Sequence, residues 1–382
     1  MPHQDSVLRQ LLKHIPWTAF DRLVTTHAAD EGVRRFDSRQ HLIALLYGQL
    51  SGAGGLRATV CGLESQQARL YHAGGKSVAR STMSDANKSR PPALLNDLFS
   101  LLLQQASRPT RRKLAETTYL IDATPLPLDT RSADWSRFSH DVCGAKLHVI
   151  YDPQGDRPIY AALTPARVND VTVAQQMPIE PGATYVFDLG YYDYAWWASL
   201  DAKGCRLVTR FKTNTPLELI RELEVPAGGD ILSDRIGLLP RRQTKNRRNP
   251  MGGPVREVRV RIEGKRELRL LSNDLDASAQ EIADLYKRRW RIELFFRWLK
   301  QNLRIRKFVG TSENAVRLQI AAALIAFLLL RLAQATQTRI TSPLAFVRLV
   351  RDNLMRRRSI ADLLPADDPP PSQSPQLTLK WC

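Results

Sequence analysis

The chain has 382 residues, a length that predicts two or three domains rather than one. Its apolar fraction of 43% excludes a wholly disordered chain. Lys and Arg number 56 against 38 Asp and Glu, and the resulting net charge of +18 indicates a polyanionic partner; nucleic acid is the leading candidate, and a ribosomal or membrane-surface role is the alternative.

The cysteines and apolar runs indicate where the protein works. Four cysteines lie far apart and form no CxxC pair, which argues against a structural zinc site or a disulfide scaffold and fits a reducing cytoplasm. The longest apolar run, residues 320–330, has 11 residues, whereas a membrane-spanning helix needs about 20. We therefore expect a buried helix there, no membrane partner, and a soluble cytoplasmic protein associated with the nucleoid.

Residues 1–112 predict a basic, helical, DNA-binding N-terminal domain. Leucines and an isoleucine recur on one helical face at Leu8, Leu11, Leu12 and Ile15. A second helix should begin with Asp37 or Ser38 as its N-cap and stop at Gly52. Residues 76–84 resemble the start of a DNA-reading helix, with hydroxyl residues capping it and Arg80 facing the DNA backbone. A plain surface helix would explain that last segment equally well.

From residue 113 to 204 the pattern changes to short apolar segments typical of strands. The predicted strands are residues 118–122, 145–151, 158–163 and 184–188. The turn Asp152–Asp156 predicts a hairpin between the second and third. The predicted helices are residues 171–176 and 192–203. Strands followed by helices indicate an α/β fold with a mixed sheet.

Residues 205–276 predict a β-rich basic insertion in that core. Between Arg241 and Arg269 there are 11 Lys or Arg and three acidic residues. Residues 255–262 alternate apolar and charged side chains, as a half-exposed strand does. The basic loop that precedes them is expected to bind DNA through Arg241, Arg242, Lys245, Arg247 and Arg248.

Three segments complete the chain. Residues 277–336 should complete the core, beginning with a helix that has Ser278 as its N-cap and runs past Lys300. Residues 337–366 predict a basic C-terminal helical region. Residues 367–382 are rich in Pro and Ser and predict a disordered tail.

Two predicted strands end in aspartate, at Asp122 and Asp188. A carboxylate at the exit of an apolar strand lies at the sheet edge where ligands usually bind, and Gly190 lets the chain turn directly after the second. An aspartate that merely begins a turn explains either one taken alone. We expect nearby His148 to be a core or surface histidine and Asp193 to belong to a turn or cap, although Asp193 is close enough to Asp188 to compete for its role. Asn169 and Asp170 are expected to cap the following helix.

The helix after Ser278 carries a third carboxylate within a polar stripe. At about 100° per residue its members lie within roughly 60° of one another; they are Tyr286, Arg289, Glu293 and Lys300. A neighbouring apolar face can dock on the sheet; it comprises Leu285, Ile292, Phe295, Phe296, Leu299 and Leu303. Metal-dependent cutting of phosphodiesters needs carboxylates that converge on two ions, with phosphate-binding groups beside them. A solvated charged helix face would have the same spacing.

Together these residues resemble the motifs of bacterial insertion-sequence DDE transposases of the family-four type, to which the transposon-five transposase belongs. The pattern Tyr-x2-Arg-x3-Glu-x6-Lys, from Tyr286 to Lys300, is similar to the family's signature. Asp188 with its neighbours Phe187 to Tyr191 is similar to the second-aspartate motif, and the segment around Asp122 to the first. Separations of 66 residues between the aspartates and 105 to Glu293 leave room for an inserted β domain. The resemblance covers residues 115–335.

The resemblance implies an RNase H-like core with two Mg²⁺ ions, for which Mn²⁺ can substitute. It implies cut-and-paste transposition: binding of double-stranded DNA with terminal inverted repeats, strand cleavage by water, and strand transfer into target DNA by a 3′-OH. The catalytic metal ligands would be Asp122, Asp188 and Glu293. Groups contacting the transposon end would be Tyr286, Arg289, Lys300 and, packed near the DNA end, Trp290. A homodimer is implied when two ends are synapsed.

The family also implies a DNA hairpin intermediate, which usually requires a flipped base held by aromatic stacking. The insertion contains no Trp, and Phe211 is its only aromatic residue. Another residue would have to hold the base, with Trp196 or Trp197 as candidates. Two other functions remain open: a non-catalytic DNA-binding repressor derived from a transposase, and a structure-specific RNase H-like nuclease that cuts branched DNA without joining strands.

Overall fold

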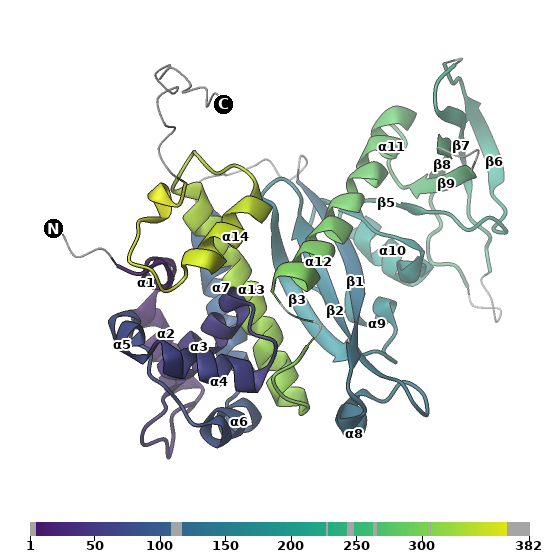
Figure 1. The fold of residues 1–382 in the computed structure, drawn as a ribbon. Helices are drawn as coiled ribbons and strands as arrows, with labels where there is room; N and C mark the ends of the chain where they lie inside the picture. The colour runs from purple at the N-terminus through teal and green to yellow at the C-terminus, as the bar shows by residue number, and fades with distance from the viewer. Residues whose placement is uncertain are drawn as a thin grey trace, which may run out of the picture. The chain divides into compact units, whose positions relative to one another are not determined.

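The computed structural model describes residues 5–107, 117–226, 228–242, 248–262, 266–303, 305 and 307–364. The chain divides into a helical unit and a sheet unit, coloured by residue number in Figure 1. The helical unit comprises residues 1–102, 302–304 and 318–382, and the sheet unit comprises residues 103–301 and 305–317. The segment boundaries expected from the sequence do not coincide with this division. The expected disordered tail lies outside the described residues.

The helical unit confirms the two helices predicted near the N-terminus, although the first ends at Leu12, before Ile15 of the predicted pattern. The four apolar residues of the first pattern are all buried. In the second helix, α3, the Asp37 carboxylate accepts a hydrogen bond from the Gln40 N–H, and Gly52 ends the helix in the left-handed conformation with φ of 72°. The helices of this unit are α1 (Val7–Leu12), α2 (Trp17–Thr26), α3 (Ser38–Ser51), α4 (Leu56–Ser65), α5 (Gln67–Leu70), η1 (Tyr71–Ala73), α6 (Arg80–Ser89), most of α7 (Pro92–Ser107), most of α13 (Glu313–Ala335), α14 (Pro343–Asn353) and η6 (Ile360–Asp362).

The helix expected from residues 76–84 begins later than predicted and without the predicted cap. α6 starts at Arg80, and Ala79 at its N-cap makes no side-chain hydrogen bond. A hydroxyl caps a helix only from the residue before the first helical one. Ser81 and Thr82 follow that residue and lie inside the first turn, so the predicted hydroxyl capping is wrong.

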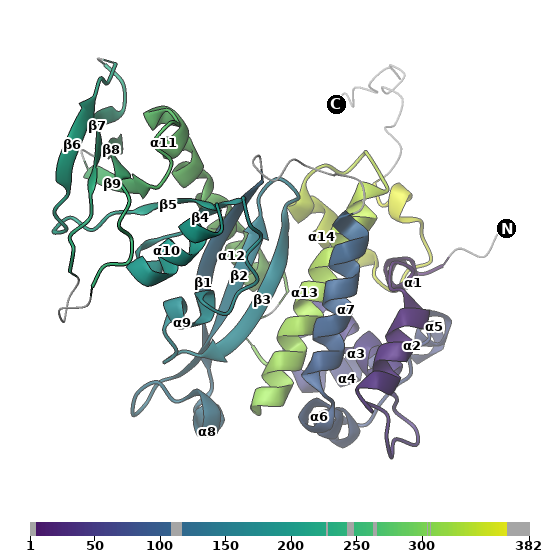
Figure 2. The same ribbon diagram turned by 180° about the vertical axis from the view of Figure 1, so that it is seen from behind.

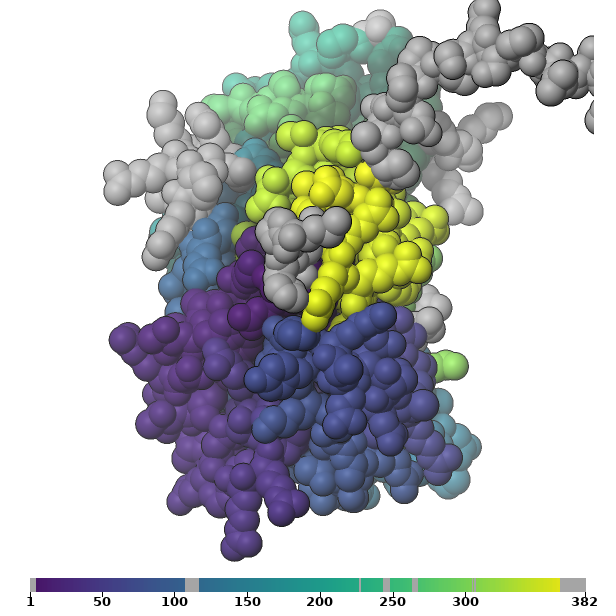
Figure 3. Space-filling view, turned by 60° about the vertical axis from the view of Figure 1, so that its left-hand side comes forward, coloured from purple at the N-terminus to yellow at the C-terminus, as the bar shows by residue number. Residues whose placement is uncertain are grey.

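Both ends of the described chain contribute to the helical unit. The Leu8 N–H donates to the Leu354 carbonyl at 2.8 Å, and the Gln10 side-chain amide donates to the Arg358 carbonyl at 2.7 Å. Figure 3 shows the yellow C-terminal segment directly beside the purple and blue N-terminal helices. The C-terminal helical region therefore belongs to the same compact unit as the N-terminal helices.

The longest apolar helix, α13, is a core helix. It has 23 residues, and its most apolar window, with a mean hydropathy of 2.0, would suffice to cross a membrane by length and composition alone. However, 83% of that window is buried inside the protein, and every residue from 320 to 330 is buried. The predicted buried helix is confirmed, and it is longer than the apolar run that indicated it.

Within the described residues, the sheet unit holds one nine-stranded sheet in the order β3-β2-β1-β4-β5-β9-β8-β7-β6. Its strands are β1 (Thr118–Leu128), β2 (Cys143–Asp152), β3 (Arg157–Pro165), β4 (Thr184–Val186), β5 (Arg206–Arg210), β6 (Glu218–Leu223), β7 (Ile231–Leu238), β8 (Val255–Ile262) and β9 (Arg266–Ser272). β1, β4 and β5 run parallel, and the other neighbouring pairs are antiparallel. The predicted mixed sheet and the β2–β3 hairpin are confirmed.

Different helices cover the two faces of the sheet. Tyr119 and Ile121 of β1 belong to a buried aromatic cluster with Trp196 and Trp197 of α10. On the other face, the ring of Phe295 in α12 lies 5.0 Å from that of Tyr151 in β2. α12 crosses in front of the strands in Figure 1, and α10 lies in front in the opposite view of Figure 2. The helices of the sheet unit are η3 (Thr130–Ser132), α8 (Ala133–Ser136), α9 (Asp170–Ala174), η4 (Leu189–Tyr191), α10 (Tyr194–Ala202), α11 (Ala279–Arg288) and α12 (Trp290–Asn302).

β1 continues beyond the aspartate at which the sequence predicted its end. It pairs with β2 as far as Leu128, so Asp122 lies inside an eleven-residue strand. Pro125 and Pro127 fall in the extension, where β4 has already ended at Val186 and one side of β1 is open. Prolines lack the N–H that a strand neighbour requires and are tolerated at such an edge. The prolines therefore did not mark the end of the strand.

The basic insertion extends the same sheet, because β9 pairs with β5. Its strand β8 does not alternate between buried and exposed residues as predicted; residues 255–258 are all buried. The buried charges are paired: Arg256 donates to both Asp234 oxygens at 2.8 and 2.6 Å, and Glu257 accepts from Arg269 at 2.6 Å. Partners on β7 and β9 make it possible to bury these charges.

The long helix predicted after Ser278 is two helices. Ser278 caps α11 as predicted, and α12 extends past Lys300 as predicted. Between them, the Arg289 N–H bonds to the Tyr286 carbonyl three residues back, at 3.0 Å, instead of four. Because Arg289 keeps right-handed helical angles, φ −53° and ψ −30°, the polar stripe continues across this tighter turn.

Removing one partner of the buried pair in the insertion should destabilise the fold. The side chains of Asp234 and Arg256 are 3% and 6% exposed, and the arginine also donates to the carbonyls of Leu275 and Ala277. Asp234→Asn leaves the buried guanidinium without its counter-charge, which typically costs about 3–5 kcal/mol. Urea denaturation followed by circular dichroism should report a loss of that size in the free energy of unfolding.

An exposed pair nearby provides the matched control. Glu222 pairs with Arg235 at 3.0 Å, and their side chains are 55% and 36% exposed. Glu222→Gln should cost no more than about 1 kcal/mol. Equal losses in the two variants would show that burial does not decide the effect.

Candidate catalytic site

The two aspartates lie where β4 has ended and the neighbouring strand β1 continues. β4 pairs with β1 only as far as Val186 opposite Leu120, so Asp122 and Asp188 each lie two residues past the last parallel pair. The Asp122 carboxylate accepts the Ala123 N–H at 2.8 Å, and the Asp188 carboxylate accepts the Gly190 N–H at 2.8 Å. Matched positions on adjacent parallel strands bring both carboxylates to the same edge.

Glu293 reaches this edge from α12 through Arg289. The Arg289 Nη2 lies 2.5 Å from Glu293 Oε1, and its Nη1 lies 3.5 Å from Asp122 Oδ2. The Arg289 and Asp122 side chains are each 16% exposed, and that of Glu293 is 31% exposed. One guanidinium therefore connects the first strand to the helix that carries the third carboxylate.

The pKa of Asp122 responds to the charges of the other two carboxylates. The pKa of Asp122 is raised from its ordinary 3.8 to about 7. Burial is the main cause, and the negative charges of Asp188 and Glu293 add to it, while the Ala123 N–H and Arg289 act in the opposite direction. Perturbed carboxyl groups of this kind are typical of functional sites.

The oxygen atoms of the three carboxylates are of the type that binds a hard divalent cation. Mg²⁺ prefers carboxylate oxygens, and these are the donors present. In the arrangement observed, no three acidic, His or Cys side chains within the described ranges converge closely enough to hold an ion. Arg289 is the positively charged partner of Asp122 and Glu293 in this arrangement. A cation can bind both carboxylates only if the guanidinium moves aside.

Tyr286 and Lys300 of the stripe, and Trp290 next to Arg289, differ in their surroundings. Tyr286 is 9% exposed, and the Arg289 guanidinium carbon lies 5.6 Å from its ring centre. Trp290 is 51% exposed, with Arg297 5.8 Å from its ring. Lys300 is half-buried further along α12. Tyr286 and Glu293 thus lie beside Arg289, which contacts Asp122, whereas Trp290 presents its ring to solvent.

The other basic residues predicted to bind DNA lie away from the carboxylates in sequence. Arg80 is exposed at the start of α6 in the helical unit. Arg241, Arg242 and Arg248 are exposed in the insertion, and Arg242 bridges to Arg248. The predicted contacts Lys245 and Arg247 lie outside the described residues.

The aromatic candidates for holding a flipped base are part of the core. Trp196 is 2% exposed and Trp197 is fully buried, with its indole N–H donating to the Tyr191 carbonyl at 3.0 Å. Phe211 is 3% exposed beneath Arg269. A base could stack on these rings only if the core opened, so the expectation that Trp196 or Trp197 is available to DNA is wrong.

Around Asp188, the structure confirms one expectation and corrects another. Asp193 caps α10, accepting the Trp196 N–H at 2.8 Å, which confirms its role as a cap. Gly190 does not have a left-handed φ. Instead, a Cβ at residue 190 would stand 3.0 Å from Asp188 Oδ1 and 3.4 Å from Asp170 Oδ2. Glycine leaves room for two carboxylates, and the second, Asp170, is a residue that the sequence indicated only as a helix cap.

Comparison with known proteins gives a consistent result. The model of the family described as "Transposase DDE domain" matches residues 113–329, which contain all three carboxylates. A second model, "Domain of unknown function (DUF4372)", matches residues 3–76.

Relatives extend the match. Over 295 residues the chain is 41% identical to y4zB of Sinorhizobium fredii, which is named as a transposase; the match covers 76% of this chain and 80% of that protein. It is 30% identical over 279 residues to "Probable transposase for insertion sequence element IS5377" of Geobacillus stearothermophilus, covering 71% and 72%. A solved piggyBac transposase synaptic complex with hairpin DNA has 12% identity and a TM-score of 0.48, covering 96% of this chain and 87% of that one. A TM-score below 0.5 does not establish a common fold.

The raised pKa of Asp122 predicts a pH-dependent stability of the metal-free protein. With a folded-state pKa of about 7 against an ordinary 3.8, the folded state keeps a proton that the unfolded state releases above about pH 4. The stabilisation is present at low pH and is lost as pH rises through about 7. The Asp122→Asn variant cannot ionise at this position. As pH rises from about 5 to about 8, its free energy of unfolding should therefore increase relative to that of the wild type, by on the order of 2–4 kcal/mol.

When the variant is compared with the wild type, the contributions of other titrating groups to the pH dependence of stability cancel. Burial lowers the pKa of His148 to about 4, but His148 is common to both proteins and its contribution cancels. Asp141→Asn, at a side chain 88% exposed, controls for the substitution itself and should leave the wild-type pH profile unaltered. Parallel profiles for Asp122→Asn and wild type in EDTA would contradict the prediction.

Proposed function

The chain belongs to the Transposase DDE domain family, and from this membership we propose that Asp122, Asp188 and Glu293 are its catalytic carboxylates. The protein is a transposase of an insertion sequence element, a DNA-binding enzyme with a DDE catalytic domain. One observation supports the residue assignment most: Arg289 contacts both Asp122 and Glu293, while the charge of Asp188 contributes to the raised pKa of Asp122.

We further propose that the protein is of the family-four type, with Tyr286, Arg289, Glu293 and Lys300 as the signature, and a relative of the transposon-five transposase. An RNase H-like core is supported by the strand order β3-β2-β1-β4-β5, in which the first three strands are antiparallel and β4 and β5 run parallel to β1. The first aspartate on β1 and the second just after β4 suit such a core.

The proposed cofactor is a pair of Mg²⁺ ions, with Mn²⁺ as a substitute, held by the three carboxylates. When bound, the ions would activate the attacking oxygen and stabilise the leaving oxygen. The protein's own part is positioning: β1 and η4 hold the aspartates, and α12 brings Glu293 to them. Once these carboxylates have another counter-charge, Arg289 becomes available to a DNA phosphate, beside the phenol of Tyr286.

The proposed partners are double-stranded DNA with terminal inverted repeats and target DNA, bound in the cytoplasm by a homodimer that synapses two ends. The exposure of Arg80, Arg241, Arg242 and Arg248 supports their contact with DNA phosphates. Strand transfer through a hairpin would need a stacking residue other than the buried Trp196 and Trp197.

Replacing any one of the three carboxylates tests the catalytic assignment. Asp122→Ala, Asp188→Ala and Glu293→Ala should each lower Mg²⁺-dependent cleavage of the element's end DNA by about 10³-fold or more, because each removes charge that holds the ions. Binding to the same DNA, measured by mobility shift, should persist. Asp193→Ala, which removes only a helix cap, should retain cleavage.

The outcomes separate the competing functions. Cleavage that survives any of the three substitutions contradicts the assignment. A wild-type protein that binds the repeats but never cuts them would be a repressor. Cutting of branched DNA without terminal repeats, and without strand joining, would identify a structure-specific nuclease.

Lys300 should bind the transposon end as a point charge to phosphate. Lys300→Ala should weaken DNA binding and lower the slope of log K against log salt by about 1, since one fewer phosphate is neutralised. Lys287→Ala, an exposed lysine on α11 outside the stripe, is the matched control and should leave the slope unchanged. Identical slopes for both variants would exclude Lys300 from the interface.

A further inference from the structure

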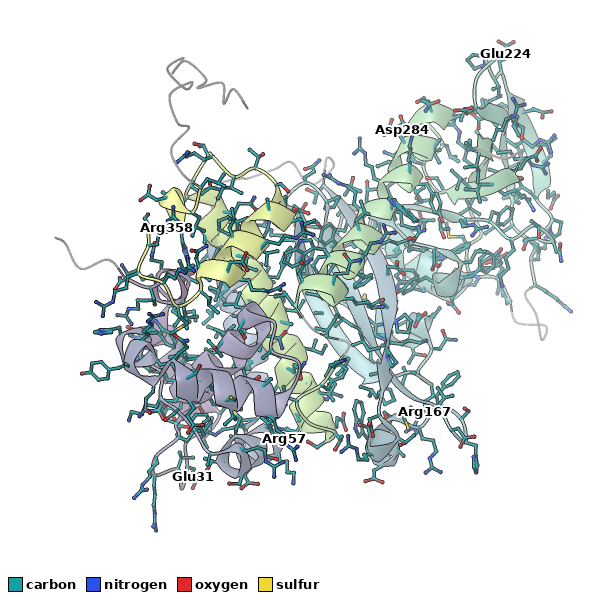
Figure 4. All side chains as sticks on the ribbon, in the orientation of Figure 1. Glu31, Arg57, Arg167, Glu224, Asp284 and Arg358 are labelled. Atoms are coloured by element: carbon teal, nitrogen blue, oxygen red, sulfur yellow. The ribbon has the colours of Figure 1, made fainter. Side chains whose placement is uncertain are left out.

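A fourth carboxylate, Asp170, lies near Asp188, one of the proposed catalytic aspartates. It is the first residue of α9, after the loop that contains Arg167, labelled in Figure 4. Its Oδ1 accepts a hydrogen bond from Lys146 Nζ at 2.8 Å. Its Oδ2 and Asp188 Oδ1 both lie close to Gly190, at 3.4 and 3.0 Å from the point where a Cβ on that residue would stand. One Asp170 oxygen is thus paired with a cation, and the other lies in the neighbourhood of Asp188.

Two buried polar atoms beside Asp170 have no hydrogen-bond partner. The Tyr191 side chain is 1% exposed, and its hydroxyl is unpaired. Burial raises the pKa of this phenol well above its ordinary value, and the charges of Asp122, Asp170 and Asp188 raise it further. His148 is fully buried, and its Nδ1 is 3.9 Å from Asp170 Oδ1, too far for a hydrogen bond.

A buried, unpaired hydroxyl close in sequence to Asp188 fits a hydrated cation. Buried polar atoms are normally satisfied by protein or by ordered water. Mg²⁺ sites keep several waters and take only one or two carboxylates directly, and the outer groups orient those waters. A phenol donor and a carboxylate acceptor on the sheet face opposite α12 are suited to this outer role.

We propose that Asp170 is a positioning residue of the cation site, which acts with the Tyr191 hydroxyl by holding the water shell of an ion bound at Asp122 and Asp188. This inference rests on the proposed function. Lys146, which also donates to the Val168 carbonyl at 3.1 Å, fixes the Asp170 carboxylate and offsets its repulsion with Asp188. The fully buried His148 is held by a hydrogen bond between its Nε2 and the Thr164 hydroxyl at 2.9 Å.

The competing explanation is a purely structural ion pair. In that case Asp170 and Lys146 would only anchor α9 to β2, and losing the charge of Asp170 would lower stability without changing the affinity for cations. The two explanations differ in a binding measurement that needs neither DNA nor catalysis.

The test measures Mn²⁺ binding to the DNA-free, full-length protein by electron paramagnetic resonance, with thermal unfolding recorded for every variant. Asp170→Asn keeps the size of the side chain and removes its charge, and should raise the Kd for Mn²⁺ about 10- to 100-fold. Tyr191→Phe removes the hydroxyl alone and should raise the Kd in the same direction. Asp193→Asn, the cap of α10, should bind Mn²⁺ as the wild type does.

A cleavage assay gives the second readout. In Asp170→Asn the Mg²⁺ concentration for half-maximal cleavage should rise, while the rate at saturating Mg²⁺ changes less, because the ligands of the ion remain. A structural defect would lower the rate at every concentration instead.

The outcomes separate this inference from the proposed function. If folded Asp170→Asn and Tyr191→Phe bind Mn²⁺ with wild-type affinity while Asp122→Asn does not, Asp170 is only the ion-pair partner of Lys146. If Asp122→Asn also binds as the wild type does, or the wild type binds no Mn²⁺, the carboxylate assignment fails and this inference with it.

Discussion

The candidate site depends on one constraint: Asp122 is buried beside the charges of Asp188 and Glu293, and the burial and both charges oppose its ionisation. Asp122, Asp188 and Glu293 share one partly buried region, where like charges interact more strongly than in water. Arg289 offsets that repulsion from the turn between α11 and α12, four residues before Glu293. The tighter turn and the positive charge are therefore both at Arg289. The packing of α12 on the sheet positions them together.

The unequal lengths of the strands create the space for this site. β4 stops at Val186 while β1 continues to Leu128, so within the described residues β1 has no parallel neighbour beyond Leu120. Asp122 lies in this extension without ending its strand. The two prolines in the extension prevent another strand from pairing there, because they supply no N–H. An open, unpaired edge beside a carboxylate gives a phosphodiester room to approach.

Local patterns in the sequence predicted local features, and long-range partners decided the rest. The stripe from Tyr286 to Glu293, the Ser278 cap and the β2–β3 hairpin depend on neighbours within a few residues, and they were predicted from the sequence. The burial of Arg256 and Glu257 depends on Asp234 and Arg269, which come from other strands, so an alternating pattern indicated exposure instead. Asp170 was missed for the same reason: its nearness to Asp188 follows from Gly190 and the sheet, whereas its own neighbours indicate only a helix start.

The buried tryptophans show how a core residue can serve a site that it never touches. Trp197 donates its indole N–H to the carbonyl of Tyr191, the last residue of the η4 turn that begins at Asp188. Trp196 packs 4.7 Å from Phe187, the residue before Asp188. Rigid aromatic packing thus fixes the backbone on both sides of the second aspartate. Because like charges at Asp122 and Asp188 oppose each other, a loosely held turn would let Asp188 move away, and the aromatic core holds that turn in place.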